Sequence, residues 1–420
     1  MPPAPDEGWS THLRCFDGRG LTRPVAAADN RAVRTPRPLI PSYATVALTA
    51  VLLAALALVG CGVRRIAPPD VTPVVRATAG EPRAFRMGFS ALPATLTEGG
   101  QQSAFDLATK YGEVLLIQRA PSWSDFLAGA TPSSKLRATT AGEREAARGR
   151  GLQLFMALDP FDAADRGRLA GLPPGMEGRD LGDPGLRDAF LAEARYIAVN
   201  YRPAYLALGM EVNATYERNP AQYQRFLEVY RAAYDVVKAS SPETQVFASF
   251  QYEQLLGVIP WEPPHPPRWE LLDAYAGKAD LLAITTYPSF AFAVARKVPP
   301  DYYLQLKART KLPIAFAAAG FASDPGRDGV NSSTRPEQRR YLQRLLSDAD
   351  ELASPLLLWF VGRDAAYLAA PPYDLVASIG LRDTQDQPKE SWAVWEDAAK
   401  RPFAAGTPSR TPTPTPGAGG

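Results

Sequence analysis

Cysteine and histidine are scarce in this 420-residue sequence, which contains two of each. Both cysteines, Cys15 and Cys61, precede the part of the chain whose composition is typical of a folded domain, so we expect no disulfide framework within it. Only His265 lies in that part, inside the proline-rich stretch 263–267. This scarcity argues against a histidine-rich zinc site and against a Ser-His-Asp triad.

An excess of charge of one sign is also missing. The chain has 46 Lys+Arg and 44 Asp+Glu, which leaves a formal net charge of +2. Without a strong field of one sign, nucleic acid is not an expected partner. Hydrophobic residues make up 46% of the chain, enough for a large core.

An uncharged apolar run occupies residues 44–60 and ends at Cys61. Its length lies between that of a signal h-region and the roughly 20 residues that span a bilayer. The tetrapeptide LVGC that ends in Cys61 resembles the bacterial lipobox, which implies that Cys61 is lipidated and becomes the mature N-terminus. An uncleaved signal anchor is the alternative. Either way, we expect an extracytoplasmic domain anchored to the cell membrane.

Proline-containing segments flank the expected domain. Residues 62–83 lack periodicity, which is typical of a flexible tether. Residues 404–420 form a Pro/Thr tract that buries too little surface to order itself. The predicted organisation is therefore an extension with signal and anchor at 1–61, a tether at 62–83, a folded domain at 84–403 and a disordered tail at 404–420.

Short apolar runs typical of buried strands recur eight times in that domain, at 84–90, 113–118, 152–159, 204–211, 245–251, 279–286, 313–318 and 355–361. Helical patterns lie between them, most clearly at 183–200, 220–240, 300–310 and 335–353. Strands that alternate with helices predict an α/β fold, a (β/α)8 TIM barrel. A doubly wound open sheet is the alternative, although no GxGxxG follows the first strand.

In such a barrel the side chains at the C-terminal ends of the strands form the functional site. These ends supply carboxylates, amides and aromatic rings, which suit the hydroxyls and apolar ring faces of a sugar. Glu211 is the most informative of them. The other predicted binding residues are Trp123, Asp159, Asn213, Gln251, Tyr252, Glu253, Tyr287 and Trp359.

Several of these residues have a structural alternative. Trp359 and Tyr287 could simply pack the barrel mouth, and Asp159 precedes a proline and could serve a turn or cap. Glu253 could be a surface residue that opens the next helix. Glu211 is harder to explain in this way, because an acid that directly follows an apolar strand has no evident capping or solubility role.

The motifs LGMEVN (208–213), ITTYP (284–288) and PIAFAAAGF (313–321) resemble those of clan A glycoside hydrolases, nearest the endo-β-1,4-galactanases. The resemblance covers about 85–394 and implies a barrel in which Glu211 takes the acid/base position. Ala318 then takes the position of the nucleophile, and Met210 replaces the asparagine that contacts the sugar 2-hydroxyl. Tyr287 falls where the family has a tyrosine near the nucleophile.

The alanine at position 318 suggests that the chemistry is lost. Retaining hydrolysis needs two carboxyl groups about 5 to 5.5 Å apart, one of which bonds to the sugar, and a methyl group cannot attack. The leading hypothesis is a membrane-tethered pseudoenzyme that binds polysaccharide or oligosaccharide. An active glycoside hydrolase whose second carboxylate is Glu253, Asp159 or Asp364 is one alternative, and a scaffolding lipoprotein is another. We expect a monomer without cofactor or metal.

Overall fold

The computed structural model describes residues 80–326, 331–370 and 373–404. The apolar run 44–60, Cys61 and most of the predicted tail lie outside the described residues, so the anchor and the tail stay predictions. Within the described part of the chain, no helix is both long and apolar enough to cross a membrane.

Nine parallel strands form a single sheet in the order β5-β4-β3-β2-β1-β9-β8-β7-β6. Their bounds are Arg86–Ser90 (β1), Val114–Arg119 (β2), Gln153–Leu158 (β3), Tyr205–Ala207 (β4), Gln245–Phe247 (β5), Ser249–Gln251 (β6), Leu282–Thr286 (β7), Ile314–Ala319 (β8) and Leu356–Trp359 (β9). Only Ala248 separates β5 from β6, the two ends of this order, so the sheet curves round into a barrel. The predicted α/β TIM-barrel fold is confirmed, with the fifth predicted strand present as two short halves.

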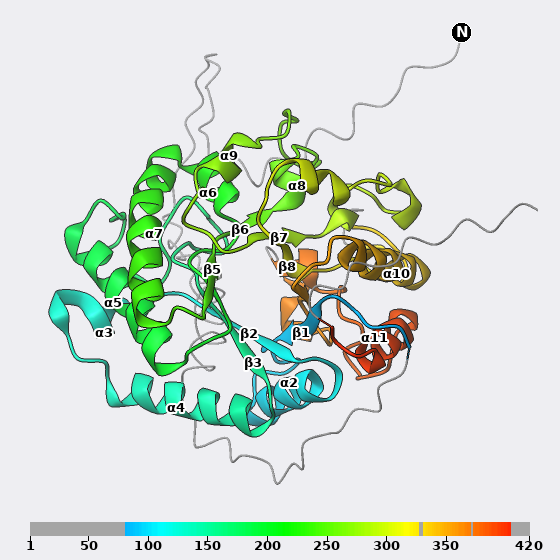
Figure 1. Ribbon diagram of the computed structural model, residues 1–420, viewed down its shortest axis with the longest axis horizontal. Helices are drawn as coiled ribbons and strands as arrows, with labels where there is room; N and C mark the ends of the chain where they lie inside the picture. Colours follow the sequence, from blue (N-terminus) through cyan, green and yellow to red (C-terminus); the bar gives the residue numbers. More distant parts are fainter. Residues whose placement is uncertain (1–79, 327–330, 371–372, 405–420) are drawn as a thin grey trace, which may run out of the picture.

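Helices surround the barrel, with α7 and α5 on one side and α10 and α11 on the other (Figure 1). Their bounds are Glu98–Tyr111 (α2), Trp123–Phe126 (α3), Ser134–Gly149 (α4), Pro184–Asn200 (α5), Val212–Arg218 (α6), Pro220–Ser240 (α7), Tyr252–Leu255 (α8), Glu270–Asp273 (α9), Arg335–Glu351 (α10) and Glu390–Lys400 (α11). Asn219 caps α7 with its side-chain oxygen, and proline occupies the first turn, as the sequence predicts.

The predicted helix at 300–310 is wrong in type. Only the 3-10 segment η5 (Leu304–Ala308) forms there. Tyr303 and Leu306 are both completely buried and lie three residues apart, the spacing that stacks side chains on one edge of a 3-10 turn.

The core has two layers. One lies between the sheet and the helices, and a smaller inner layer fills the barrel. Strand β8 shows how the layers are separated, because Phe316 points to the outer layer and Ala315 to the inner one. The register of β8 shifts between Phe316 and Ala319, and this bulge turns both Ala317 and Ala318 into the barrel.

Candidate functional site

The chain leaves β4 through a backbone that is not a regular strand. Gly209 has φ +114°, and a Cβ there would lie 2.7 Å from the ring of Phe226, so only glycine fits. Two residues later Glu211 has φ 49°, in the left-handed region, and precedes the first residue of α6. This conformation costs a non-glycine residue about 1–2 kcal/mol and persists only where its surroundings impose it.

Three side chains hold this strained strand end in place. Asp159, at the end of β3, accepts two hydrogen bonds from the guanidinium of Arg166, at 2.8 and 3.1 Å. The same pair also binds the backbone of Met210. Asp159 accepts a hydrogen bond from the N–H of Met210 at 3.3 Å, and Arg166 donates one to the carbonyl of Met210. Ser249 in β6 accepts the N–H of Glu211 at 3.1 Å. The backbone on both sides of the Met210–Glu211 peptide bond is therefore fixed by β6 and by the segment that follows β3.

The carboxylate of Glu211 is half-buried and points towards β7, where the hydroxyl of Thr285 donates to it at 2.8 Å. Burial raises the pKa of Glu211 above its ordinary value, and the nearby charge of Arg166 and the Thr285 bond only partly oppose that change. A carboxyl group with a raised pKa holds its proton closer to neutral pH, as a general acid requires.

Ala318 lies beside this contact. Thr285 is the register partner of Ala318 across the β7–β8 ladder, so the side chain that hydrogen-bonds Glu211 neighbours the position that the resemblance assigns to the nucleophile. Ala318 is 1% exposed and belongs to the inner layer together with Met210, Tyr287 and other apolar side chains. The resemblance thus pairs one carboxylate with a methyl group.

Glu253 is completely buried, so the interpretation of it as a surface residue is wrong. Its carboxylate accepts from the hydroxyl of Thr286 at 2.6 Å, from the N–H of Tyr287 at 2.9 Å and from the side chains of Gln251 and Tyr302. Burial raises its pKa. Donors from four residues enclose this carboxylate, and they tie α8 to β7 and the segment before η5.

The predicted binding residues are less accessible than expected. The structure gives each of the eight an exposure of 0–7%: Trp123, Asp159, Asn213, Gln251, Tyr252, Glu253, Tyr287 and Trp359. The indole N–H of Trp359 donates to the carbonyl of Ile379, and that of Trp123 to the carbonyl of Ala170. Asn213 exchanges two hydrogen bonds with the backbone of Gln251. A direct contact between these side chains and a sugar stays a prediction.

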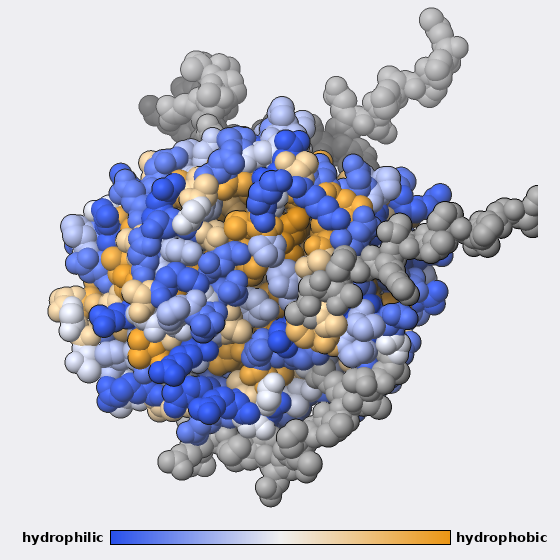
Figure 2. Space-filling view, viewed as in Figure 1, coloured by the Kyte–Doolittle hydropathy of each residue, from blue (hydrophilic) through white to orange (hydrophobic). Residues whose placement is uncertain are grey.

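Partly exposed rings gather around Tyr287 instead. Phe290 stacks on Tyr287 with centroids 5.3 Å apart, and Trp261 lies 5.4 Å from Phe290. Phe360 meets Tyr287 edge-on at 6.3 Å. Figure 2 shows hydrophobic residues gathered near the middle of the face on which β7 and β8 are seen in Figure 1. Sequence reasoning missed Trp261 and Phe360, as well as Arg166 and Ser249.

Among the described residues, no group of three or more His, Cys, Asp or Glu side chains could hold a metal ion.

No protein-family model matches the sequence. No curated protein matches it either. Similar folds are found among solved structures. The exo-β-1,4-mannosidase Op5Man5 from Opitutaceae bacterium strain TAV5 superposes with TM-score 0.57 at 18% identity, over 79% of this chain and 62% of that chain. This chain therefore spans less than two thirds of the mannosidase.

Two GH5_18 proteins, each in complex with Manβ1-4GlcNAc, are also similar. The one from Bifidobacterium longum subsp. longum matches with TM-score 0.55 at 14% identity, over 76% of this chain and 80% of that chain. The one from Streptomyces cattleya matches with TM-score 0.55 at 16% identity, over 79% and 82%. These structural neighbours are clan A glycoside hydrolases, and at such identities the similarity establishes the fold.

Proposed function

We propose that this protein binds carbohydrate outside the cytoplasm, tethered to the membrane through Cys61, and that retaining hydrolysis is lost or strongly impaired. The observation that carries the proposal is the pairing of Glu211 at the end of β4 with Ala318 at the end of β8. Thr285 contacts the first and is the register partner of the second. The site thus keeps its acid and the bulge that directs residue 318 inward, without a group that attacks the sugar.

The sugar class follows from the rings and from the structural neighbours. Trp261, Phe290 and Phe360 remain partly exposed around Tyr287, and such rings can stack on the apolar face of a pyranose. The neighbours bear names that refer to β-linked mannose. We therefore take β-1,4-linked mannooligosaccharides as the first ligands to test, and the galactanase resemblance makes β-1,4-galactooligosaccharides the second.

Binding to the full chain in detergent, measured by titration calorimetry, tests this function. We expect saturable binding of at least one of these series, weakened about tenfold or more by Glu211→Gln, since a hydrogen bond to a charged group contributes about 1.5–3 kcal/mol. Val199→Ala is the control, because Val199 is 46% exposed on α5. Absence of binding across both series and a wider glycan panel would overturn the proposal.

An active hydrolase is the second candidate, and the raised pKa of Glu211 favours it. An inverting mechanism needs a base about 6.5–9.5 Å from the acid. Of the predicted bases, Asp159 is engaged with Arg166 and Glu253 is enclosed by donors, while Asp364 forms an ion pair with Lys389. Reducing-sugar release from a polysaccharide panel that disappears in Glu211→Gln would establish this candidate in place of the first.

The scaffolding alternative gains no support from the described surface. Among the described residues, the large hydrophobic side chain that is well exposed is Val199, which makes no patch. The monomeric state stays a prediction.

A further inference from the structure

The segment that follows β9 turns back across the barrel mouth. We call residues 373–381 the mouth segment. It contains the 3-10 turn η7 (Tyr373–Val376) and ends in Ile379 and Leu381, both completely buried. Val376 and Ile379 join the inner layer of the barrel core, which includes Ala318 and Met210. Apolar side chains from this segment therefore lie over the barrel interior.

Ile379 lies against the end of β8. A Cβ placed on Gly320 would come within 2.8 Å of Ile379 Cδ1 and 3.0 Å of Tyr287 Cδ1, so the isoleucine and the tyrosine meet above this glycine. Gly320 comes two residues after Ala318. The mouth beside the nucleophile position is thus closed by an aliphatic side chain.

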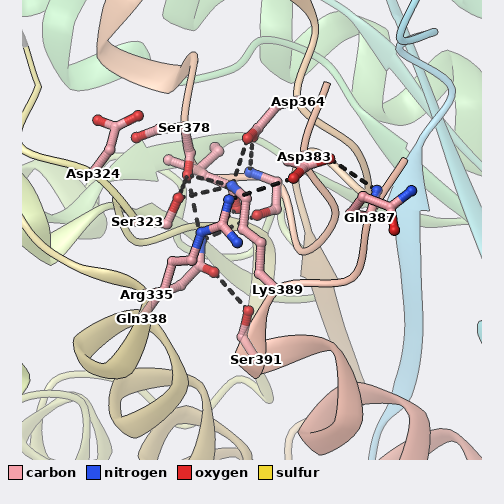
Figure 3. Close-up of polar contacts among 12 residues, drawn as sticks. Ser323, Asp324, Arg335, Gln338, Asp364, Ser378, Asp383, Gln387, Lys389 and Ser391 are labelled. Atoms are coloured by element: carbon pink, nitrogen blue, oxygen red, sulfur yellow. Dashed lines mark hydrogen bonds and ion pairs between the residues drawn. The ribbon is translucent and has the colours of Figure 1, made fainter. Parts of the chain in front are cut away.

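A buried polar cluster holds the mouth segment down, with Lys389 at its centre (Figure 3). Lys389 Nζ lies 2.5 Å from Asp364 and donates to Ser323 Oγ at 2.8 Å and to the carbonyl of Ser378 at 3.0 Å. Asp364 in turn accepts the N–H of Gly380 at 2.7 Å. An ion pair inside the protein therefore fixes the backbone on both sides of Ile379.

Two further side chains from α10 and β9 complete this attachment. Gln338 donates to the carbonyls of Ile379 and Gly380, at 3.1 and 3.2 Å, and is itself fixed by Ser391 (Figure 3). Trp359 donates to the carbonyl of Ile379 at 2.8 Å. Because these groups are buried and paired with one another, opening the segment would leave several of them without partners.

The far end of the segment extends over the neighbouring strands. Asn331, in the loop after β8, donates to the carbonyl of Leu375. Just before the segment, the hydroxyl of Tyr367 donates to the carbonyl of Pro93, beyond β1, at 2.7 Å. Burial, and to a smaller extent the charge of Asp162, raises the pKa of Tyr373. The covered arc of the mouth therefore runs from β8 over β9 to β1.

The opposite arc keeps its polar and aromatic groups accessible. Glu211 after β4 is half-buried, and Trp261 and Phe290, after β6 and β7, are partly exposed. A sugar chain that passes through a binding site needs both sides of the mouth open. Here the side after β4, β6 and β7 presents a carboxylate and aromatic rings, whereas the side after β8 and β9 is covered by backbone that buried hydrogen bonds hold in place.

We propose that the site accepts the end of a glycan chain and excludes chain-internal binding, and that Ile379 and Tyr373 on the mouth segment set this limit. The inference rests on the proposed carbohydrate binding and adds the mode in which the glycan is held.

Binding stoichiometry tests the proposal. The full chain in detergent is titrated with β-1,4-mannohexaose and with a long linear β-1,4-mannan of narrow length distribution. We expect one protein bound per glycan chain in both cases, with similar affinity per chain. Several proteins bound per mannan chain, in proportion to its length, would overturn the chain-end mode while leaving carbohydrate binding intact. No binding to either glycan would overturn both proposals for β-mannans.

Variants of the mouth segment sharpen the test. Tyr373→Ala removes a partly exposed side chain, and Ile379→Ala removes the buried one. We expect each folded variant to bind several copies along one mannan chain, an increase of several-fold over wild type. Val199→Ala serves as the surface control. Unchanged stoichiometry in folded Tyr373→Ala and Ile379→Ala would show that the segment does not limit the mode.

Discussion

The ends of β4 and β8 are connected through Thr285 and depart from regular strand geometry in different ways. At β4 the departure is two residues with positive φ, Gly209 and Glu211, and the second still bears a carboxylate. At β8 it is a bulge that turns Ala317 and Ala318 inward, and neither bears a functional group. Both strand ends have an irregular backbone, but only the end of β4 carries a carboxylate.

This difference separates the shape of a site from its reactivity. The left-handed Glu211 is held by Ser249 and by the grip of Asp159 and Arg166 on Met210, so its position does not depend on a partner at β8. Ala318 is held by ladder bonds and core packing. A different side chain at residue 318 would therefore leave these contacts of Glu211 in place.

Introducing a carboxylate at the end of β8 should have the largest effect. We expect Ala318→Glu to increase hydrolysis of an aryl β-mannoside by about a thousandfold or more, because loss of a catalytic nucleophile commonly lowers rates by several orders of magnitude. Release of the aryl alcohol, followed by absorbance, measures the rate.

The matched control is Ala317→Glu, which adds the same group one position earlier in the bulge. The double variant Ala318→Glu, Glu211→Gln should lose the gain. A folded Ala318→Glu protein no faster than wild type would show that the β8 end has lost the geometry as well as the chemistry.

Removing Arg166, which with Asp159 holds the backbone of Met210, should have the next largest effect. Arg166→Met leaves Asp159 buried without its partner, which we expect to lower the free energy of unfolding by roughly 3–5 kcal/mol. Urea unfolding measures the change. Arg179→Met removes an exposed partner of Asp183 and should cost less than about 1 kcal/mol. Equal effects of the two variants would argue against a stabilising role of the buried Asp159–Arg166 pair.

Relieving the strain at Glu211 should have a smaller effect of opposite sign. Glu211→Gly allows the left-handed backbone at no steric cost, so we expect a gain of about 1 kcal/mol, offset in part by the greater entropy of the unfolded chain. Glycan binding should weaken in the same variant. Glu211→Ala removes the same carboxylate but keeps the strain, so it should melt below Glu211→Gly, and a Glu211→Ala at least as stable as Glu211→Gly would contradict the interpretation.

The smallest expected effect is a difference between Glu211, after β4, and Ala318, in β8, in how the stability of the protein depends on pH. Burial raises the pKa of Glu211 in the folded protein above its ordinary value of 4.5. The stabilisation of the folded state by the protonated carboxyl group is therefore fully present below pH 4.5 and is lost as the pH rises through the folded pKa. We therefore expect the stability of wild type relative to Glu211→Gln to fall as pH rises above 4.5. Ala318→Ser should shift the wild-type curve without changing its slope. A slope unchanged by Glu211→Gln would contradict the pKa direction.

The places of the strands could be predicted because buried strands are short runs of apolar residues, although the fifth run forms two strands, β5 and β6. The limits of the strands could not. The predicted strand 204–211 stops at Ala207 in the structure, since the positive φ of Gly209 and Glu211 ends the ladder. Glycine at 209 was the visible sign, but its meaning depends on Phe226, which lies against it from α7.

The site could be predicted only where a residue lies within a few positions of the end of its own strand. Glu211 and Tyr287 were found in this way. Arg166, in the loop after β3, and Ser249, in β6, hold the Met210–Glu211 backbone from other parts of the chain, so no local pattern marks them. Trp359 and Phe360 are adjacent aromatics of which only one reaches the inner layer, and the choice depends on the β8–β9 register, which the sequence does not display.

The interruption at Ala248 has a consequence for the dynamics of the barrel. β5 is laddered only to β4 and β6 only to β7, and bonds such as Ser249 N–H to the carbonyl of Gly209 connect across the gap. Amide hydrogens of β5 and β6, on either side of Ala248, should exchange with solvent sooner than those of β2 or β3. Ser249, which holds the N–H of Glu211, is the first residue beyond the gap. The time for which the hydrogen bonds around Ala248 stay formed therefore limits how long Glu211 stays in its left-handed conformation.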